Sequence, residues 1–166
     1  MDSRERKENI YIGLGSNMGA RTDHLSTAIR IMTEHEIQIL NQSSIYESSA
    51  WGYTQQPAFL NQVVEIATDL DPDNLLKTLK SIEQQMGRQK RGHWQEREID
   101  LDIILYNQKI IKTPHLEIPH RWMKERRFVL EPLAEIAADF VDPISGSTIA
   151  RLLEMTQDEN EIYKFL

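Results

Sequence analysis

Cysteine is absent from this sequence of 166 residues, and its absence removes several kinds of site at once. Disulfides, thiolate nucleophiles and zinc sites built on thiolates are all excluded. Because nothing in the chain requires an oxidising compartment, we expect a cytoplasmic protein. The N-terminus also lacks the apolar stretch of a secretory signal, so residues 1–8 are expected to form a flexible polar tail.

Long hydrophobic runs and net positive charge are missing as well. No apolar stretch approaches the roughly 20 residues that a membrane-spanning helix needs, so no membrane association is expected. The 26 acidic residues outnumber the 19 basic ones and give a net charge of −7, which argues against general nucleic-acid binding. The length predicts one domain over residues 1–166 with its own hydrophobic core, and we expect a monomer.

Two aspartates, Asp100 and Asp102, stand in an apolar run that predicts a strand over residues 99–106. Side chains alternate along a strand, so both carboxylates are expected on one face, with Cα atoms roughly 7 Å apart. The opposite, core-facing side of that strand is predicted to carry Ile99, Leu101, Ile103 and Leu105. Carboxylates in apolar surroundings need a metal ion or an arginine partner, and the preceding segment 87–97 is strongly basic. Hard oxygen ligands beside arginines suit magnesium and a polyphosphate.

Hydrophobic periodicity predicts the element order β-α-β-β-α-β through residue 106, with further helices at the C-terminus. Strands are expected at residues 10–14, 37–46, 59–68, 99–106 and 110–111, and helices around residues 25–32, 72–86, 128–137 and 148–155. Thr22 or Asp23 is expected to cap the first helix, and Asp71 followed by Pro72 to begin the second. This order is that of a ferredoxin-like α+β fold, an antiparallel sheet with helices on one face, which leaves the other face free for a site.

Three weaker motifs have ordinary structural interpretations. The glycines at residues 13–19 fit neither a P-loop nor a dinucleotide fingerprint, so we interpret them as a turn between strand and helix. Phe59 and Asn61 share a strand face, and a ring beside an amide suits a heterocycle, although taken alone the pair is better explained as a core residue and an edge residue. The basic segment could be only a solvated charged turn. Its glycines Gly87 and Gly92 indicate instead a loop that could close over phosphates, where the Trp94 side chain could cover an aromatic ring.

Four segments carry a shared pattern that covers nearly the whole chain. They are Tyr11–Asn17, Ser44–Glu47 continuing to Phe59–Asn61, His93–Ile104, and Ile118–His120 continuing to Arg126–Leu130. The third reads His-Trp-Gln-Glu-Arg-Glu-Ile-Asp-Leu-Asp-Ile-Ile and has the form of a family signature. Together the segments resemble the 6-hydroxymethyl-7,8-dihydropterin pyrophosphokinase family of folate biosynthesis. The resemblance implies a ferredoxin-like fold and transfer of pyrophosphate from ATP to the pterin hydroxymethyl oxygen, with attack on the β-phosphorus and release of AMP.

The resemblance also implies roles for particular residues. Asp100 and Asp102 would bind two magnesium ions, while Arg88 and Arg97 would neutralise the transferring phosphates. The pterin, with a phenylalanine on either side of its ring, would be contacted by Ser48, Trp51, Phe59, Asn61, Trp94 and Phe128. ATP would be surrounded by Glu83, Lys90, Trp94, Arg97, Ile103, His120 and Arg126. Three active-site loops would lie near residues 16–21, 47–56 and 88–97.

The signature segment departs from the family at Gln95-Glu96, where Gly-Pro is usual. The added negative charge and the lost Gly-Pro pair should alter ATP affinity or turnover without removing the chemistry. Two alternatives stay open, a magnesium-dependent phosphohydrolase on the same scaffold and a non-catalytic nucleotide-binding module. Pterin-dependent release of AMP would separate the transferase from the first, and ATP binding without magnesium-dependent turnover would mark the second.

Overall fold

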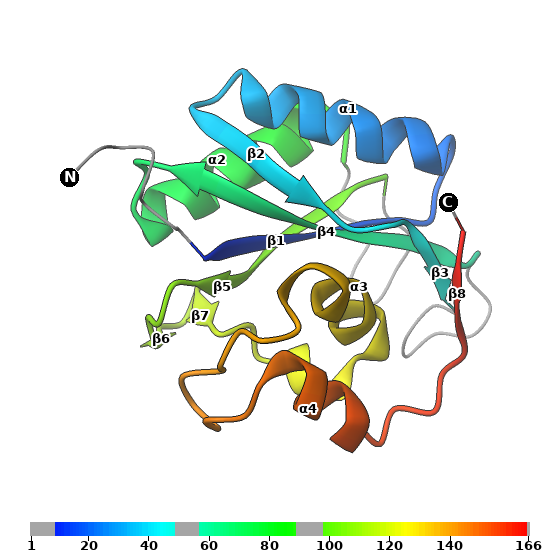
Figure 1. Ribbon diagram of the computed structural model, residues 1–166. Coiled ribbons are helices and arrows are strands. Elements are labelled where there is room, and N and C mark those ends of the chain that lie inside the picture. Colours follow the sequence, from blue (N-terminus) through cyan, green and yellow to red (C-terminus); the bar gives the residue numbers. More distant parts are fainter. Residues whose placement is uncertain (1–8, 49–56, 89–97, 166) are drawn as a thin grey trace.

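The computed structural model describes residues 9–48, 57–88 and 98–165 (Figure 1). The predicted tail, residues 1–8, lies outside the described residues. In chain order the elements are β1 (Ile10–Ser16), α1 (Arg21–Thr33), β2 (Ile37–Gln42), β3 (Tyr46–Ser48), β4 (Phe59–Thr68), α2 (Pro72–Gln85), β5 (Asp100–Tyr106), β6 (Ile111–Lys112), β7 (Glu117–Ile118), the 3-10 helix η2 (Met123–Glu125), α3 (Arg127–Ala137), α4 (Ile149–Met155) and β8 (Ile162–Lys164).

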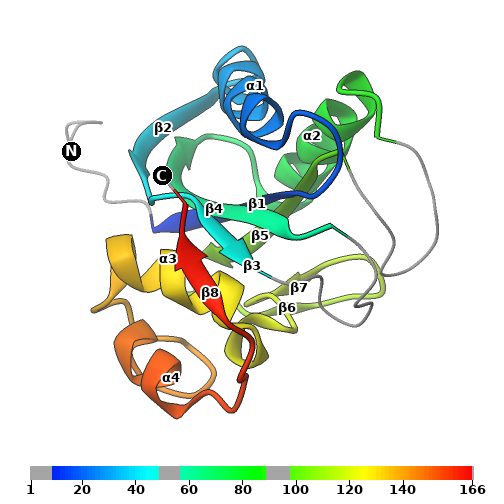
Figure 2. The ribbon, with the colours of Figure 1, turned by 90° about the vertical axis from the view of Figure 1, so that its right-hand side faces the viewer.

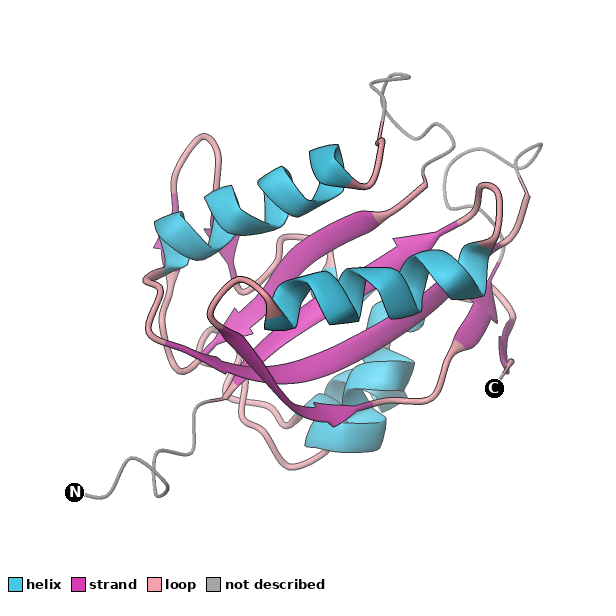
Figure 3. Ribbon diagram, turned by 90° about the horizontal axis from the view of Figure 1, so that it is seen from above, coloured by secondary structure: helices cyan, strands magenta, loops and turns pink. Residues whose placement is uncertain are grey.

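The main sheet is antiparallel and has the strand order β5-β1-β4-β3-β8, with β2 paired to the far half of β4. Helices α1 and α2 lie side by side on one face, as the view from above makes clear (Figure 3). This arrangement confirms the predicted ferredoxin-like α+β fold. The prediction that the opposite face is left free is wrong in part, because α3 packs against β4 there and α4 packs against α3 (Figure 1).

The sheet separates two hydrophobic cores. Ile10, Ile12 and Leu14 of β1 pack with α1 and α2 in the first core, whereas Tyr11 packs with α3 in the second. A register shift opposite Tyr11 and Ile12 inserts one extra residue into β5. Beyond this bulge the alternation reverses, so Leu105 belongs to the second core and its predicted place beside Ile99, Leu101 and Ile103 is wrong.

The N-termini of α1 and α2 were both predicted from local capping residues, and the prediction is correct for α2 only. Asp71 caps α2 as predicted, because its Oδ1 atom accepts a hydrogen bond from the Asn74 amide at 2.8 Å and Pro72 follows at N1. The predicted cap of α1 is wrong, since the helix begins at Arg21 after Ala20 and no side chain caps it. None of the helices in the described segments has the length and apolar character needed to cross a bilayer.

The predicted strand over residues 37–46 is divided in two by Ser43. The Ser43 amide donates to the Val63 carbonyl at 2.9 Å, and the Val63 amide donates to Ser43 Oγ at the same distance. These two bonds satisfy the backbone of β4 at the break between β2 and β3. The resulting short β3 lies beside the N-terminal end of β4, where the site is found.

Candidate functional site

A row of paired residues crosses the sheet and brings the predicted site together. Asp100 of β5 pairs with Gly15 of β1, Gly15 pairs with Asn61 of β4, and Asn61 pairs with Tyr46 of β3. In the next row Asp102 pairs with Gly13. Paired residues in an antiparallel sheet share a face, so both aspartates lie on the side covered by α3. The prediction that Asp100 and Asp102 share a face is therefore confirmed.

These rows form the base of a cavity of about 700 Å³, counting its solvent-open mouth. Its wall includes the predicted site residues Phe59, Asn61, Asp100, Asp102, His120, Arg126 and Phe128. The cavity combines aromatic rings, an amide and carboxylates, which is the usual composition of a small-molecule site. Four further predicted residues, Trp51, Lys90, Trp94 and Arg97, lie outside the described residues.

The floor of this cavity is bare backbone. A Cβ atom on Gly15 would lie 3.4 Å from Asn61 Oδ1, and one on Gly13 would lie 3.1 Å from Ile104 Cδ1. The interpretation of this glycine run as a turn is wrong for these two residues, because β1 continues through Ser16. Glycine inside a strand often marks a place where a ligand or another backbone comes close to the main chain. The two glycines of β1 were therefore a sequence signal for this part of the cavity.

One wall of the cavity is formed by β4, which β3 supports through its pairing. The Asn61 amide nitrogen donates a hydrogen bond of 2.7 Å to Ser48 Oγ, and Ser48 pairs with Phe59 across the two strands. Both polar side chains are buried. This bond fixes the orientation of the Asn61 amide, so the wall offers an aromatic ring and a positioned amide together.

The opposite wall is formed by the start of α3 and the segment before it. The Arg126 guanidinium carbon lies 5.4 Å from the centre of the Phe128 ring and 5.6 Å from that of the Trp122 ring. Contacts of this kind hold a guanidinium and an aromatic ring in fixed relation. Arg126 and Phe128 are thus presented to the cavity from a single short segment.

A buried charge network stands behind the aspartates. Glu83 of α2 contacts Arg88 through Oε1 at 2.7 Å and accepts a hydrogen bond from the Leu101 amide through Oε2, also at 2.7 Å. Arg88 reaches on to Asp100, with 3.6 Å between Nη2 and Oδ1. Burial raises the pKa of Glu83, and the cations of Lys80 and Arg88 oppose that rise. Arg88 therefore lies beside Asp100, and the buried Glu83 side chain links α2 to the Leu101 amide of β5.

A second, more polar hollow meets the cavity at Asp102 and His120. Its border includes Lys80, Ile103, His115 and Glu117. Ile103, a predicted site residue, belongs mainly to the first core and reaches this hollow at its edge. Lys80 of α2 was not predicted. Neither were His115 and Glu117, because the hairpin of β6 and β7 was only partly recognised and its side chains could not be positioned opposite Asp102.

The aspartates also fit a divalent metal. Each offers hard oxygen ligands from the same strand face, and no group of three or more His, Cys, Asp or Glu gathers within the described ranges. Magnesium characteristically takes one or two protein carboxylates and completes its shell with water and phosphate oxygens. Asp100 and Asp102 suit such a partial shell better than a closed, all-protein metal site.

His120 should make the protein less stable in acid. Burial, followed by the nearby charge of Arg126, lowers the pKa of His120 to about 4, and its Nδ1 atom accepts a hydrogen bond from the Trp122 amide. A lowered pKa means that the unfolded chain binds the proton first, so the stabilisation is complete above pH 6.5 and is lost as the pH falls towards 4. The loss should reach about 3 kcal/mol below pH 4, of which about 2 kcal/mol falls between pH 6.5 and pH 4.5.

Urea unfolding at pH 6.5 and pH 4.5 measures this effect. His120→Gln should flatten the dependence of unfolding free energy on pH. An equal slope in the wild type and in His120→Gln would contradict the assignment.

Comparison with known proteins identifies clear relatives. Residues 11–138 match a family model described as 7,8-dihydro-6-hydroxymethylpterin-pyrophosphokinase (HPPK). The 2-amino-4-hydroxy-6-hydroxymethyldihydropteridine pyrophosphokinase of Aquifex aeolicus is 42% identical over 135 residues, covering 81% of this chain and 84% of that protein. The Bacillus subtilis protein of the same name is 46% identical over 127 residues, or 76% of each chain.

Solved structures support the fold. Wild-type HPPK-DHPS of Plasmodium falciparum superposes with a TM-score of 0.70 at 19% identity, covering 92% of this chain and 42% of that one. A variant of the same protein with pterin and p-hydroxybenzoate gives a TM-score of 0.71 at 16% identity over 92% of this chain and 44% of that one. This chain thus spans less than half the length of these structures, and the likeness at such identity concerns the fold alone.

Proposed function

Because this chain belongs to the 7,8-dihydro-6-hydroxymethylpterin-pyrophosphokinase family, it is a pyrophosphokinase of folate biosynthesis, and we propose that ATP and magnesium serve its reaction. The pyrophosphate of ATP passes to the hydroxymethyl group of 6-hydroxymethyl-7,8-dihydropterin. The hydroxymethyl oxygen bonds to the β-phosphorus, the bond from that phosphorus to the oxygen of the α-phosphate breaks, and AMP leaves. In-line transfer of this kind depends on positioning and charge neutralisation more than on a protein nucleophile.

The observation that carries this proposal is the meeting of two hollows at Asp102. The aromatic cavity holds the pterin, with Phe59 and Phe128 against its ring and Asn61 hydrogen bonded to its edge. The polar hollow bordered by Lys80 and His120 takes the nucleotide. The reacting oxygen and the β-phosphorus then approach one another over the face that carries both aspartates.

Asp100 and Asp102 would hold two magnesium ions at this junction. Bound there, magnesium would supply neutralisation of the polyphosphate charge. Arg88 presents a second source of positive charge at Asp100, and Glu83 fixes its direction. Burial lowers the pKa of Arg88, but the carboxylates of Asp100 and Glu83 outweigh burial and raise it above its ordinary value, so it remains a cation throughout.

We propose further that the enzyme acts as a cytoplasmic monomer on these two small substrates. The absence of cysteine suits a reducing compartment.

An assay of AMP formation tests the proposed reaction. ATP and magnesium should give AMP only when 6-hydroxymethyl-7,8-dihydropterin is also present. The amount of AMP formed should equal the amount of pterin diphosphate formed. Omission of magnesium should abolish the product. Release of AMP or inorganic phosphate without the pterin would indicate a hydrolase instead, and ATP binding without turnover would indicate a binding module.

A further inference from the structure

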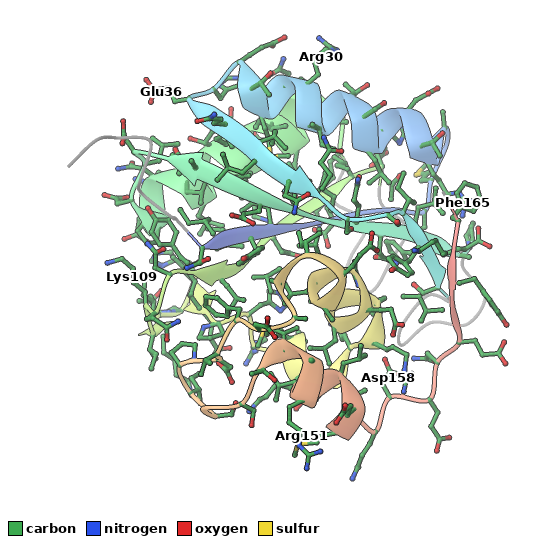
Figure 4. All side chains as sticks on the ribbon, viewed as in Figure 1. Arg30, Glu36, Lys109, Arg151, Asp158 and Phe165 are labelled. Carbon is green, nitrogen blue, oxygen red and sulfur yellow. The ribbon has the colours of Figure 1, made fainter. Side chains whose placement is uncertain are left out.

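The C-terminal segment, residues 156–165, lies beyond the stretch that the family model matches, which ends at residue 138. It leaves α4, runs along the outside of the molecule and ends in β8 beside β3 (Figure 2). The labelled side chains of Asp158 and Phe165 mark its beginning and its end (Figure 4). We call this segment the strap, because it contacts residues that support both walls of the aromatic cavity.

Asp158 of the strap makes the first contact, which is with Arg127 at the start of α3. Its Oδ2 atom accepts a hydrogen bond of 2.7 Å from the Arg127 amide, and its carbonyl accepts one of 3.1 Å from Arg127 Nε. Arg127 is the residue between Arg126 and Phe128, which both line the cavity. The N-cap residue of α3, Arg126, makes no side-chain cap of its own, so the strap supplies a carboxylate to this helix end.

Asp158 is itself held in place. Its other carboxylate oxygen, Oδ1, accepts from the Asn160 amide at 3.0 Å, and its own amide donates to Thr156 Oγ1 at 3.3 Å. The carboxylate is therefore oriented by the strap before it reaches Arg127. A pre-oriented acceptor fixes its partner more closely than a freely rotating one.

The second contact is the pairing of β8 with β3 at the other wall. Ile162 pairs with Ser48, Lys164 pairs with Tyr46, and the Phe165 amide donates to the Ile45 carbonyl at 2.6 Å. Ser48 accepts the hydrogen bond that orients Asn61. Without β8, the three-residue β3 would be an edge strand paired on one side only, and a strand that short is weakly held.

The end of the strap is also fixed to the rest of the protein. The ring of Phe165 lies 5.7 Å from the guanidinium carbon of Arg21. Arg21 in turn donates to Glu47 Oε2 at 3.0 Å and to the Ala58 carbonyl at 2.8 Å. Glu47 belongs to β3 and Ala58 directly precedes Phe59, so this contact holds the beginning of the first wall.

We propose that the strap sets the separation of the two cavity walls and that Asp158 is a positioning residue for the pterin. The inference rests on the proposed function, because it needs the pterin ring to lie between Phe59 and Phe128. Stacking on two rings requires both to be held to within a fraction of an ångström, and one continuous segment touches the supports of both. The segment does not contact the reacting atoms, so its effect falls on substrate affinity.

Asp158→Ala tests this assignment in the full-length protein. We expect the KM for 6-hydroxymethyl-7,8-dihydropterin to rise roughly tenfold, while kcat changes by less than about threefold. Asp158→Asn keeps an oxygen acceptor for the Arg127 amide and should restore most of the affinity. Phe165→Ala, at the opposite end of the strap, should also raise the KM for the pterin.

Asp71→Ala is the matched control. Asp71 makes the same kind of bond, carboxylate to backbone amide at 2.8 Å, at the start of α2 on the other face of the sheet. It should lower Tm by a similar amount and leave the KM for the pterin unchanged. If the wild type is active but the KM for the pterin is unchanged in both Asp158→Ala and Phe165→Ala, the role assigned to the strap is overturned and the proposed function still stands. A wild type that forms no AMP in the presence of pterin would overturn the proposed function and the assignment with it.

Discussion

Replacing Asp102 with alanine should remove nearly all pterin-dependent AMP formation and leave the fold intact. Asp102 is the carboxylate at which the aromatic cavity and the polar hollow meet. Removing one oriented electrostatic group from an active site typically costs about 10² to 10³ in kcat, and a residue that also binds metal should lie at or above the upper end. We expect a fall of at least about 10³ in kcat at saturating substrates. Circular dichroism and Tm should resemble those of the wild type, since Asp102 does not belong to either hydrophobic core.

Glu65→Ala provides the matched control for this substitution. Glu65 is a carboxylate on the same sheet face, paired opposite Tyr11 near the far end of β4, and it does not border the cavity. Its loss should leave AMP formation within about twofold of the wild type. Substantial activity of Asp102→Ala across a titration with magnesium would contradict the metal assignment, as would an equal loss in both variants.

Replacing Glu83 with alanine should have the largest effect on stability. The Glu83 side chain is 3% exposed, and its removal leaves the buried Leu101 amide without its acceptor and Arg88 without its closest carboxylate. Breaking a buried pair of this kind typically costs about 3–5 kcal/mol. Urea unfolding should therefore show a fall of about 3 kcal/mol or more in unfolding free energy at an unchanged m value.

Two further variants separate the possible roles of Glu83. Glu83→Gln keeps an acceptor for the Leu101 amide, so its loss of stability should be smaller. Lys80→Ala removes the exposed partner, whose side chain is 45% exposed, and should change stability by no more than about 0.5 kcal/mol. A rise in the KM for ATP with no loss of stability in Glu83→Ala would instead favour the direct nucleotide contact that the family resemblance implies.

Local signals in the sequence determined much of the fold. The alternation of side chains along a strand correctly predicted that Asp100 and Asp102 share a face, because no bulge lies between these two residues of β5. It failed at Leu105, since the bulge arises from the pairing of β5 with β1, which the segment itself does not encode. Asp71 and Pro72 identified the start of α2, because a cap bonds to residues only three positions away.

Long-range contacts account for the features that the sequence did not predict. The start of α1 at Arg21 coincides with side-chain bonds to Glu47 and Ala58, which lie far along the chain. The polar hollow depends on the hairpin of β6 and β7, whose strands are two residues each and too short to leave a periodic pattern. The shared strand face of Phe59 and Asn61 could be predicted, but the site role of both, like that of Phe128, could be assigned only through the family resemblance.

The main-chain floor at Gly13 and Gly15 has a consequence for drug resistance. An inhibitor that rests on this floor touches atoms common to every amino acid, so a mutation elsewhere in the wall does not remove those contacts. Escape at the floor itself requires added bulk, and a new Cβ would stand against Ile104 or Asn61. Such a mutation would also make the cavity shallower for the natural substrate, so compounds that lie low on β1 should be the hardest for the enzyme to evade.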